Sequence, residues 1–280
     1  MGFEQGGAGM RITYVFYSVK DYSDIQYGEW LLEIFEKYGL HIEKVGEFEP
    51  IRKTFVPKDF PKLWRVDKTT GLPSSFSLLF RGKSEVSFSA QVISNVNLFN
   101  HGQHLFCFNG MSLWLTVKKS YDFEKLISLG DELFSWSEGV YGYITEINND
   151  PDFVVGSGDK LPKGWEDIDY LMHRSFDISP EGWKMSRGNI GMAGIPDLLW
   201  VNYFGKPYLA EKDFQLPDDC VTVSHGVRFR LTEKPIDERL STPTFLQQHK
   251  DIFGNGWFRQ ISGVSKVRLP YFDRSEITML

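Results

Sequence analysis

Two histidines and a cysteine lie at a spacing that metal sites use. His101 and His104 form an H-x-x-H pair, and Cys107 follows three residues later. Imidazole nitrogens and thiolates bind zinc, but a convincing zinc site needs three or four ligands in a closed geometry. No fourth ligand lies nearby in the sequence, and the surroundings are typical of a turn that enters a strand. We therefore expect no metal or other cofactor, and we keep a small metal-dependent hydrolase that uses His101 and His104 as an alternative function.

The two cysteines of the chain, Cys107 and Cys220, are the candidate nucleophiles. Nucleophilic catalysis needs a thiolate that a neighbouring base activates, a role to which His225 or His249 could contribute. The sequence around these residues shows no activating context and favours buried, inert thiols. Two cysteines so far apart also exclude a disulfide framework, which suits a reducing compartment.

A glycine-rich segment, residues 186–194, is where a phosphate-binding loop would be sought. Its glycines are Gly188, Gly191 and Gly194. The segment lacks the lysine–serine ending of a phosphate-binding loop, and an aromatic strand follows where the N-terminus of a helix would be required. The pattern therefore favours a plain loop.

Acidic residues are concentrated between residues 121 and 172. Twelve acids and three lysines give that segment a net charge of −9, whereas the whole chain has −6. A concentrated negative potential steers a basic partner and speeds its association. A run of acids is equally typical of a surface that is only solvated. A pair of catalytic carboxylates would need a polar cleft, which the pattern does not suggest. The acids are Asp122, Glu124, Asp131, Glu132, Glu138, Glu146, Asp150, Asp152, Asp159, Glu166, Asp167 and Asp169.

Three of these acids have an unusual position. Asp131, Glu132 and Glu138 lie at the C-terminal end of a predicted helix or just beyond it, where the helix dipole disfavours negative charge. Their placement calls for another reason, and contact with a basic protein surface is one. We predict that they contact the partner protein and that, as exposed charges, they contribute little to folding.

The composition bounds the class of protein. The chain has 280 residues, of which 41% are hydrophobic and 15% aromatic, enough for a sizeable core. The net charge of −6 and the pI of about 5.6 argue against nucleic acid as a partner, because phosphate binding requires a basic surface. No apolar run reaches the roughly 18 residues of a membrane span, and the N-terminus lacks the pattern of a signal peptide. We expect a cytoplasmic protein without membrane contact.

Strand and helix patterns together predict an α+β fold. Residues 25–38 carry apolar side chains at three- and four-residue spacing, which indicates an amphipathic helix, and residues 121–137 repeat this pattern. Residues 85–95 contain alternating apolar and polar side chains, the period of a half-buried strand. We expect an antiparallel or mixed sheet, or sheets, with helices packed on one face.

The length of the chain allows one large domain or two modest ones. Residues 1–9 are rich in glycine and are predicted to be flexible. Residues 10–280 are predicted to form a single globule built from two halves of similar size, residues 10–150 and 151–280.

The second half is organised around residues 195–209, a run of large apolar and aromatic side chains typical of a buried strand. Trp200 and Phe204 are predicted core residues on one face of this strand, with Asn202 between them. A polar side chain in such a place usually satisfies a nearby backbone group, and we expect that role for the Asn202 amide. A hairpin with its turn at residues 224–226 is predicted to follow.

Three segments carry a resemblance to a known family: residues 199–205 (LWVNYFG), 227–232 (VRFRLT) and 269–273 (LPYFD). In these segments the chain resembles a family of bacterial immunity proteins from polymorphic toxin systems, which are antidotes encoded beside secreted or contact-delivered toxins. The resembling elements run from about Asp197 to Asp273. Their motifs are structural and aromatic, with no catalytic residue among them.

The resemblance implies a non-enzymatic α+β protein that neutralises a toxin by binding it, and it fixes no position that contacts the toxin. Together with the acidic segment, it predicts a cytoplasmic immunity protein whose partner is a cognate protein toxin with a basic surface. Besides the hydrolase, a structural or scaffold module without a toxin partner is the other alternative.

Overall fold

The structure is a computed structural model of the chain. It describes residues 9–18, 20–47, 50–64, 76–83, 86–94, 99–101, 104–106, 109–118, 120–149, 178–179, 182–183, 195, 197–254 and 256–258. For residues 76, 99–101, 104–106, 109, 178–179 and 182–183 it describes the backbone alone. The N-terminal segment that we predict to be flexible therefore lies outside the described residues, apart from Gly9.

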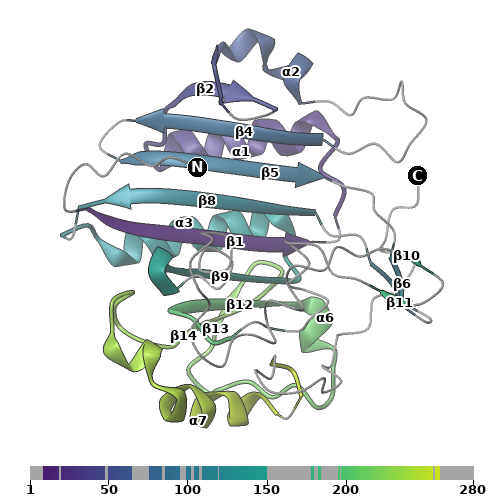
Figure 1. The fold of residues 1–280 in the computed structure, drawn as a ribbon, viewed down its shortest axis with the longest axis vertical. Coiled ribbons are helices and arrows are strands. Elements are labelled where there is room, and N and C mark those ends of the chain that lie inside the picture. Colours follow the sequence, from purple (N-terminus) through teal and green to yellow (C-terminus); the bar gives the residue numbers. More distant parts are fainter. Residues whose placement is uncertain are drawn as a thin grey trace.

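A ten-stranded sheet forms the centre of the fold (Figure 1). Its strand order is β13-β14-β12-β9-β1-β8-β5-β4-β2-β3, and all neighbouring strands are antiparallel. The predicted α+β fold is thereby confirmed, with an antiparallel sheet. The strands are β1 (Met10–Ser18), β2 (Ile42–Gly46), β3 (Lys53–Thr54), β4 (Phe76–Lys83), β5 (Ser87–Ser94), β8 (Asn109–Val117), β9 (Tyr141–Glu146), β12 (Val201–Gly205), β13 (Val221–Val223) and β14 (Gly226–Arg230). Two short pairs are separate from this sheet: β6 (Phe99–His101) with β7 (His104–Phe106), and β10 (Ile178–Ser179) with β11 (Gly182–Trp183).

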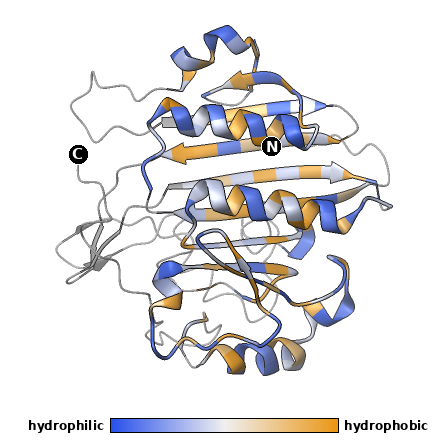
Figure 2. Ribbon diagram, turned by 180° about the vertical axis from the view of Figure 1, so that it is seen from behind, coloured by the Kyte–Doolittle hydropathy of each residue, from blue (hydrophilic) through white to orange (hydrophobic). Residues whose placement is uncertain are grey.

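Two long helices, α1 (Ile25–Lys37) and α3 (Phe123–Ser137), cover one face of the sheet. Figure 2 views the molecule from that side, where both helices lie in front of the strands. Each helix begins after an aspartate, Asp24 or Asp122, whose side chain accepts a hydrogen bond from the backbone N–H two residues later. Their buried residues recur at three- and four-residue spacing, as the amphipathic pattern predicts.

A third helix, α7 (Pro243–Phe253), packs on the opposite face, at the end of the sheet formed by β12 and β14. The ring centroid of Phe253 lies 5.1 Å from that of Phe204 in β12 and 5.4 Å from that of Phe229 in β14. The alternate residues Tyr203 and Arg228 contact α3 instead, because successive side chains of a strand point to opposite faces. The predicted packing of helices on one face therefore describes α1 and α3, and α7 covers part of the other face.

The remaining helical segments are short: Pro57–Asp59, α2 (Phe60–Leu63), Ile147–Asn149, α6 (Lys206–Leu209) and Glu238–Ser241. Among the described residues, none of the helices combines the length and the apolar character needed to cross a bilayer.

β1 lies in the interior of the sheet, between β8 and β9. Both faces of this strand are buried. Tyr14 and Phe16 contact α3 through a hydrogen bond and a ring contact, and the alternate residues Val15 and Tyr17 are buried on the other side. Six of the nine residues of β1 are accordingly apolar or aromatic: Met10, Ile12, Tyr14, Val15, Phe16 and Tyr17.

β12 joins the second half of the chain to the strands of the first half, because it pairs with β9 on one side and with β14 on the other. Gly205 ends this strand and donates its N–H to the carbonyl oxygen of Val140 at 2.8 Å. A Cβ atom at this position would lie 2.0 Å from the carbonyl oxygen of Gly139. The close approach of the two backbones therefore requires glycine at the end of the LWVNYFG segment.

Candidate functional site

The histidine pair lies in the hairpin formed by β6 and β7, where His101 and His104 are opposite each other in the backbone register. Their side chains, and the whole of Cys107, lie outside the described residues, so the metal-dependent hydrolase stays a hypothesis. Among the side chains that the structure describes, no three His, Cys, Asp or Glu residues are grouped so that they could hold a metal ion.

Cys220 is a half-buried free thiol. Desolvation and the neighbouring charge of Asp219 raise its pKa to about 11, so the thiol is protonated at neutral pH and is a poor nucleophile. In the described part of the chain, Cys220 has no hydrogen bond to either histidine: His249 bonds through Nδ1 to the carbonyl oxygen of Phe245 at 2.8 Å, and His225 lies in the turn between β13 and β14. The glycine-rich loop at residues 186–194 lies outside the described residues.

Trp200, Asn202 and Phe204, the predicted core residues of the second half, are completely buried. The Asn202 side chain accepts a hydrogen bond from the N–H of Leu199 at 3.0 Å and donates one to the carbonyl oxygen of the same residue at 2.8 Å. The amide thus satisfies a nearby backbone group and holds the bend from which β12 starts.

The expectation that Trp200 and Phe204 share one face of a strand is wrong. Trp200 lies in the bend before β12, and its ring contacts Phe123 at the start of α3, with 5.8 Å between centroids. Phe204 lies within β12 and packs against Phe253 of α7 on the opposite face. The period-two rule holds only for extended backbone, and the bend interrupts it.

Asp131 binds two groups of the neighbouring strands. The hydroxyl of Tyr203 in β12 donates to Oδ1 at 3.0 Å, and the guanidinium of Arg228 in β14 forms an ion pair with Oδ2. The side chain of Asp131 is 29% exposed and that of Arg228 only 18%, so this ion pair is largely removed from water.

Glu132 and Glu138 have the same combination of partners, one cation and one tyrosine hydroxyl. Glu132 pairs with Lys37 of α1 and accepts a hydrogen bond from the hydroxyl of Tyr38 at 3.0 Å. Glu138 pairs with Lys20 at 3.0 Å and accepts a hydrogen bond from the hydroxyl of Tyr27 at 2.8 Å. These contacts tie the C-terminal half of α3 to α1 and to the segment that follows β1.

The assumption that Asp131, Glu132 and Glu138 are free, exposed charges is therefore wrong. Each is about one-third exposed or less and is neutralised within the molecule. The unfavourable position near the end of α3 has an internal explanation, since partners from other elements compensate for the helix dipole. Of the other acids in the segment, Asp122, Glu124 and Glu146 also have internal hydrogen bonds, and Asp150, Asp152, Asp159, Glu166, Asp167 and Asp169 lie outside the described residues.

Burial and pairing shift the pKa values of two of these carboxyls in opposite directions. Desolvation raises the pKa of Asp131 by more than the charge of Arg228 lowers it. Desolvation also opposes the ionisation of Glu138, but its hydrogen bonds with Lys20 and Tyr27 outweigh this effect, and the pKa of this carboxyl is lowered.

These directions predict opposite pH dependences of stability for two conservative variants. A lowered folded-state pKa means that Glu138 contributes stability above its ordinary pKa of 4.5 and loses it as the pH falls through the folded-state value. Because the pKa of Asp131 is raised, the fold favours its protonated form. This carboxyl therefore contributes stability below its ordinary pKa of 3.8, and the contribution is lost as the pH rises through the folded-state value. As the pH is raised from about 3 to 7, Glu138→Gln should therefore lose stability relative to the wild type, and Asp131→Asn should gain stability relative to the wild type. Melting temperatures across this range measure both slopes, and slopes of the same sign would contradict the assignment.

The exposed apolar side chains are a feature that sequence reasoning missed. Five of the six large hydrophobic side chains exposed in the described part of the chain lie between residues 209 and 252. Single exposed apolar residues are ordinary, and it is a contiguous apolar patch on the surface that marks a binding site. No periodicity in the sequence identifies them, because most lie in loops or at the ends of elements. They are Leu209, Leu216, Val221, Ile236 and Ile252, and the sixth is Trp30 of α1.

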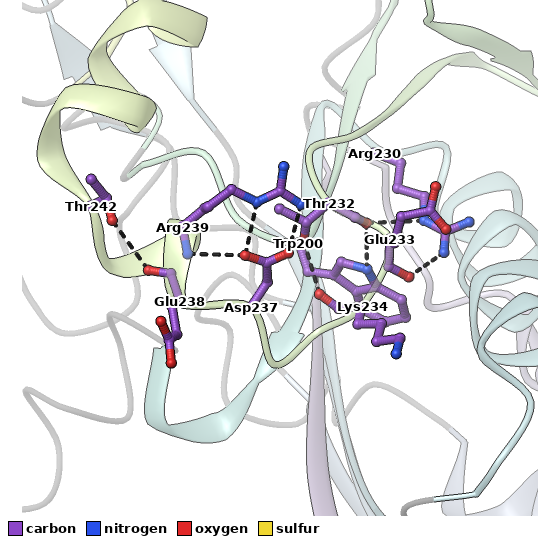
Figure 3. Close-up of polar contacts among 9 residues, drawn as sticks. All are labelled: Trp200, Arg230, Thr232, Glu233, Lys234, Asp237, Glu238, Arg239 and Thr242. Atoms are coloured by element: carbon purple, nitrogen blue, oxygen red, sulfur yellow. Dashed lines mark hydrogen bonds and ion pairs between the residues drawn. The ribbon is translucent and has the colours of Figure 1, made fainter.

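The loop between β14 and α7 is held by hydrogen bonds at both ends (Figure 3). At one end, Trp200 Nε1 and Arg230 Nε both donate to the carbonyl oxygen of Thr232, at 3.0 and 3.1 Å. At the other end, Asp237 accepts hydrogen bonds from the backbone N–H and the guanidinium of Arg239. These hydrogen bonds fix both ends of the loop, and the shared carbonyl oxygen of Thr232 connects the buried Trp200 to Arg230 at the end of β14.

Comparisons with known proteins leave the family of the chain open. No protein-family model matches the chain, and no curated protein matches it. Among solved structures, the fold is similar to that of the "Pseudomonas aeruginosa T6SS protein PA0821", with a TM-score of 0.47 and 10% sequence identity, over 86% of this chain and 77% of that chain. A likeness at this level says nothing about the activity or the partners of this chain.

Proposed function

We propose that this chain is an immunity protein that binds a cognate bacterial toxin directly and neutralises it in the cytoplasm. The toxin has a basic surface, which complements the net charge of −6. The proposal assigns no catalytic step to the chain. The folded chain then neutralises the toxin by binding to its surface.

The observation that supports this proposal is the pairing of two of the segments that resemble polymorphic-toxin immunity proteins. Residues 199–205 contain β12, and residues 227–232 contain all of β14 except Gly226; the two strands are adjacent, with Val201 opposite Arg230 and Phe204 opposite Val227. The third segment, residues 269–273, lies outside the described residues. The polar side chains Asn202, Tyr203 and Arg228 of these strands bind groups within the fold, as expected of a motif with a structural role.

Co-expression with a candidate toxin tests the proposal. The probe is the C-terminal domain of the protein encoded by the adjacent gene, chosen because it kills a host cell when it is expressed alone. We expect the chain to restore growth and to bind the purified domain in a one-to-one complex, measured by isothermal titration calorimetry. Growth arrest that persists at full soluble expression of the chain, together with no heat of binding, would overturn the proposal.

Gly205→Ala is a matched negative control for this experiment. The added methyl group would overlap the carbonyl oxygen of Gly139, so β12 could not close against the chain at the start of β9. Loss of protection in this variant, together with loss of its folded circular dichroism spectrum, would show that protection requires the intact fold.

A further inference from the structure

Within the described residues, the large sheet ends in two edge strands, β3 and β13. β3 has two residues, and one of them is Lys53, a charge that discourages pairing with a further strand. β13 contains neither a charged residue nor a proline. Val221 and Thr222 of this strand are exposed, Val221 to 46%. Of these two edges, β13 is the one suited to accept another strand.

The register of the hairpin shows which backbone groups of β13 face outward. Val223 pairs with Gly226 across a two-residue turn, and Thr222 pairs with Val227. In a hairpin of this kind the residues that flank the turn exchange both backbone hydrogen bonds, and bonded and non-bonded pairs then alternate along the strands. The N–H and C=O of Thr222 therefore point away from β14, towards the open edge of the sheet.

Two carboxylates stand directly before this edge. Asp218 and Asp219 are exposed, and in the described part of the chain neither carboxylate has an ion pair or a hydrogen bond. They differ in this respect from Asp131, Glu132 and Glu138, which are neutralised within the molecule. A cationic segment that pairs with β13 would be attracted by these two carboxylates.

We propose that β13 accepts an extended segment of the toxin that carries lysine or arginine, as an additional strand of the sheet. The backbone of Thr222 supplies hydrogen bonds to this segment, Val221 supplies an apolar contact, and Asp218 and Asp219 bind its cations. This inference rests on the proposed function, and it locates the contact surface at the edge of the sheet, away from the paired carboxylates of α3.

Two substitutions of one residue test the backbone contact. Thr222→Pro removes the outward N–H and leaves the hydrogen bonds to β14 in place, because proline is tolerated on the open side of an edge strand. Thr222→Ala removes the same side chain and keeps the N–H. With the candidate toxin domain of the adjacent gene as the probe, we expect Thr222→Pro to bind at least about tenfold more weakly than Thr222→Ala. Melting curves of both variants verify that each is folded.

The variant Asp218→Asn with Asp219→Asn tests the charge contact independently of the backbone. We expect slower association with the same toxin domain at low salt, and a difference from the wild type that disappears at about 1 M salt, where the Debye length is about 3 Å. Trp30→Ala, which changes the exposed aromatic residue of α1, is the control and should bind like the wild type.

Four results would overturn the inference. The first is equal affinity of Thr222→Pro and Thr222→Ala. The second is association of the double Asn variant at the wild-type rate at low salt. The third is loss of binding in Trp30→Ala alone, which would place the contact on α1. The fourth is a wild-type dimer, in the absence of the toxin domain, that Thr222→Pro dissociates. If the wild type itself neither binds the toxin domain nor protects the cell, the proposed function fails as well. If the wild type protects and one of these results is obtained, only the inference about β13 fails.

Discussion

Replacing Trp200 by alanine is expected to lower the free energy of unfolding by about 3–5 kcal/mol, because it removes a completely buried indole. The substitution leaves a cavity beside Phe123 and removes the hydrogen bond from Nε1 to the carbonyl oxygen of Thr232. Chemical denaturation monitored by circular dichroism measures the change. We also expect a lower yield of soluble protein and, through stability, weaker protection.

Trp30→Ala is the matched control for this prediction, since Trp30 is 39% exposed on α1. Its effect on the free energy of unfolding should be about 0.5 kcal/mol or less, as is usual for surface substitutions. If the melting temperature were unchanged in Trp200→Ala, the indole would have to lie on the surface, and it would become a candidate contact residue.

Reversing Asp131, Glu132 and Glu138 to lysine is expected to destabilise the protein by about 3 kcal/mol or more, contrary to what free surface charges would imply. The largest part comes from Asp131, because its replacement by lysine would place an ammonium group beside the largely buried guanidinium of Arg228. The other two reversals each replace an attraction to a lysine by a repulsion. Urea denaturation of the triple variant and of each single variant measures the total and its parts.

A reversal of three glutamates on α1 provides the control with the same change in net charge. Glu29, Glu33 and Glu36 are exposed, and the structure shows no ion pair for them in the described part of the chain. Their reversal to lysine should change the free energy of unfolding by about 0.5 kcal/mol per residue or less. Equal destabilisation by both triple variants would mean that net charge, and not the specific pairs, determines the effect.

The elements of this fold were predictable where the pattern is local. α1 and α3 were predictable because their apolar residues repeat with the helical period. The β13–β14 hairpin was predictable because a short turn signal separates its two strands; the turn is residues 224 and 225, and Gly226, predicted to lie in the turn, begins β14. These features depend on residues only a few positions apart, so a short stretch of sequence is enough to predict them.

The environment of the carboxylates could not be predicted, because it depends on residues far apart in the sequence. Glu138 pairs with Lys20, and Asp131 pairs with Arg228, which lies in a strand of the second half. Counting charges within a segment records the acids and omits the cations that the fold brings to them. The bend before β12 was missed for a related reason, since the Asn202 amide that holds it gives no signal distinct from any other buried polar residue.

The position of β1 has a consequence for the synthesis of the protein. Of the strands that the structure describes, β1 is the first to be synthesised, and both of its neighbours, β8 and β9, are made much later. At roughly 5–20 residues per second, the delay is on the order of 10 s. During that interval a largely apolar strand has two unpaired edges, which makes the nascent chain a target for chaperones and prone to aggregation. The amount of active protein in a cell then depends on how well this early segment is protected while the rest of the chain is still being translated.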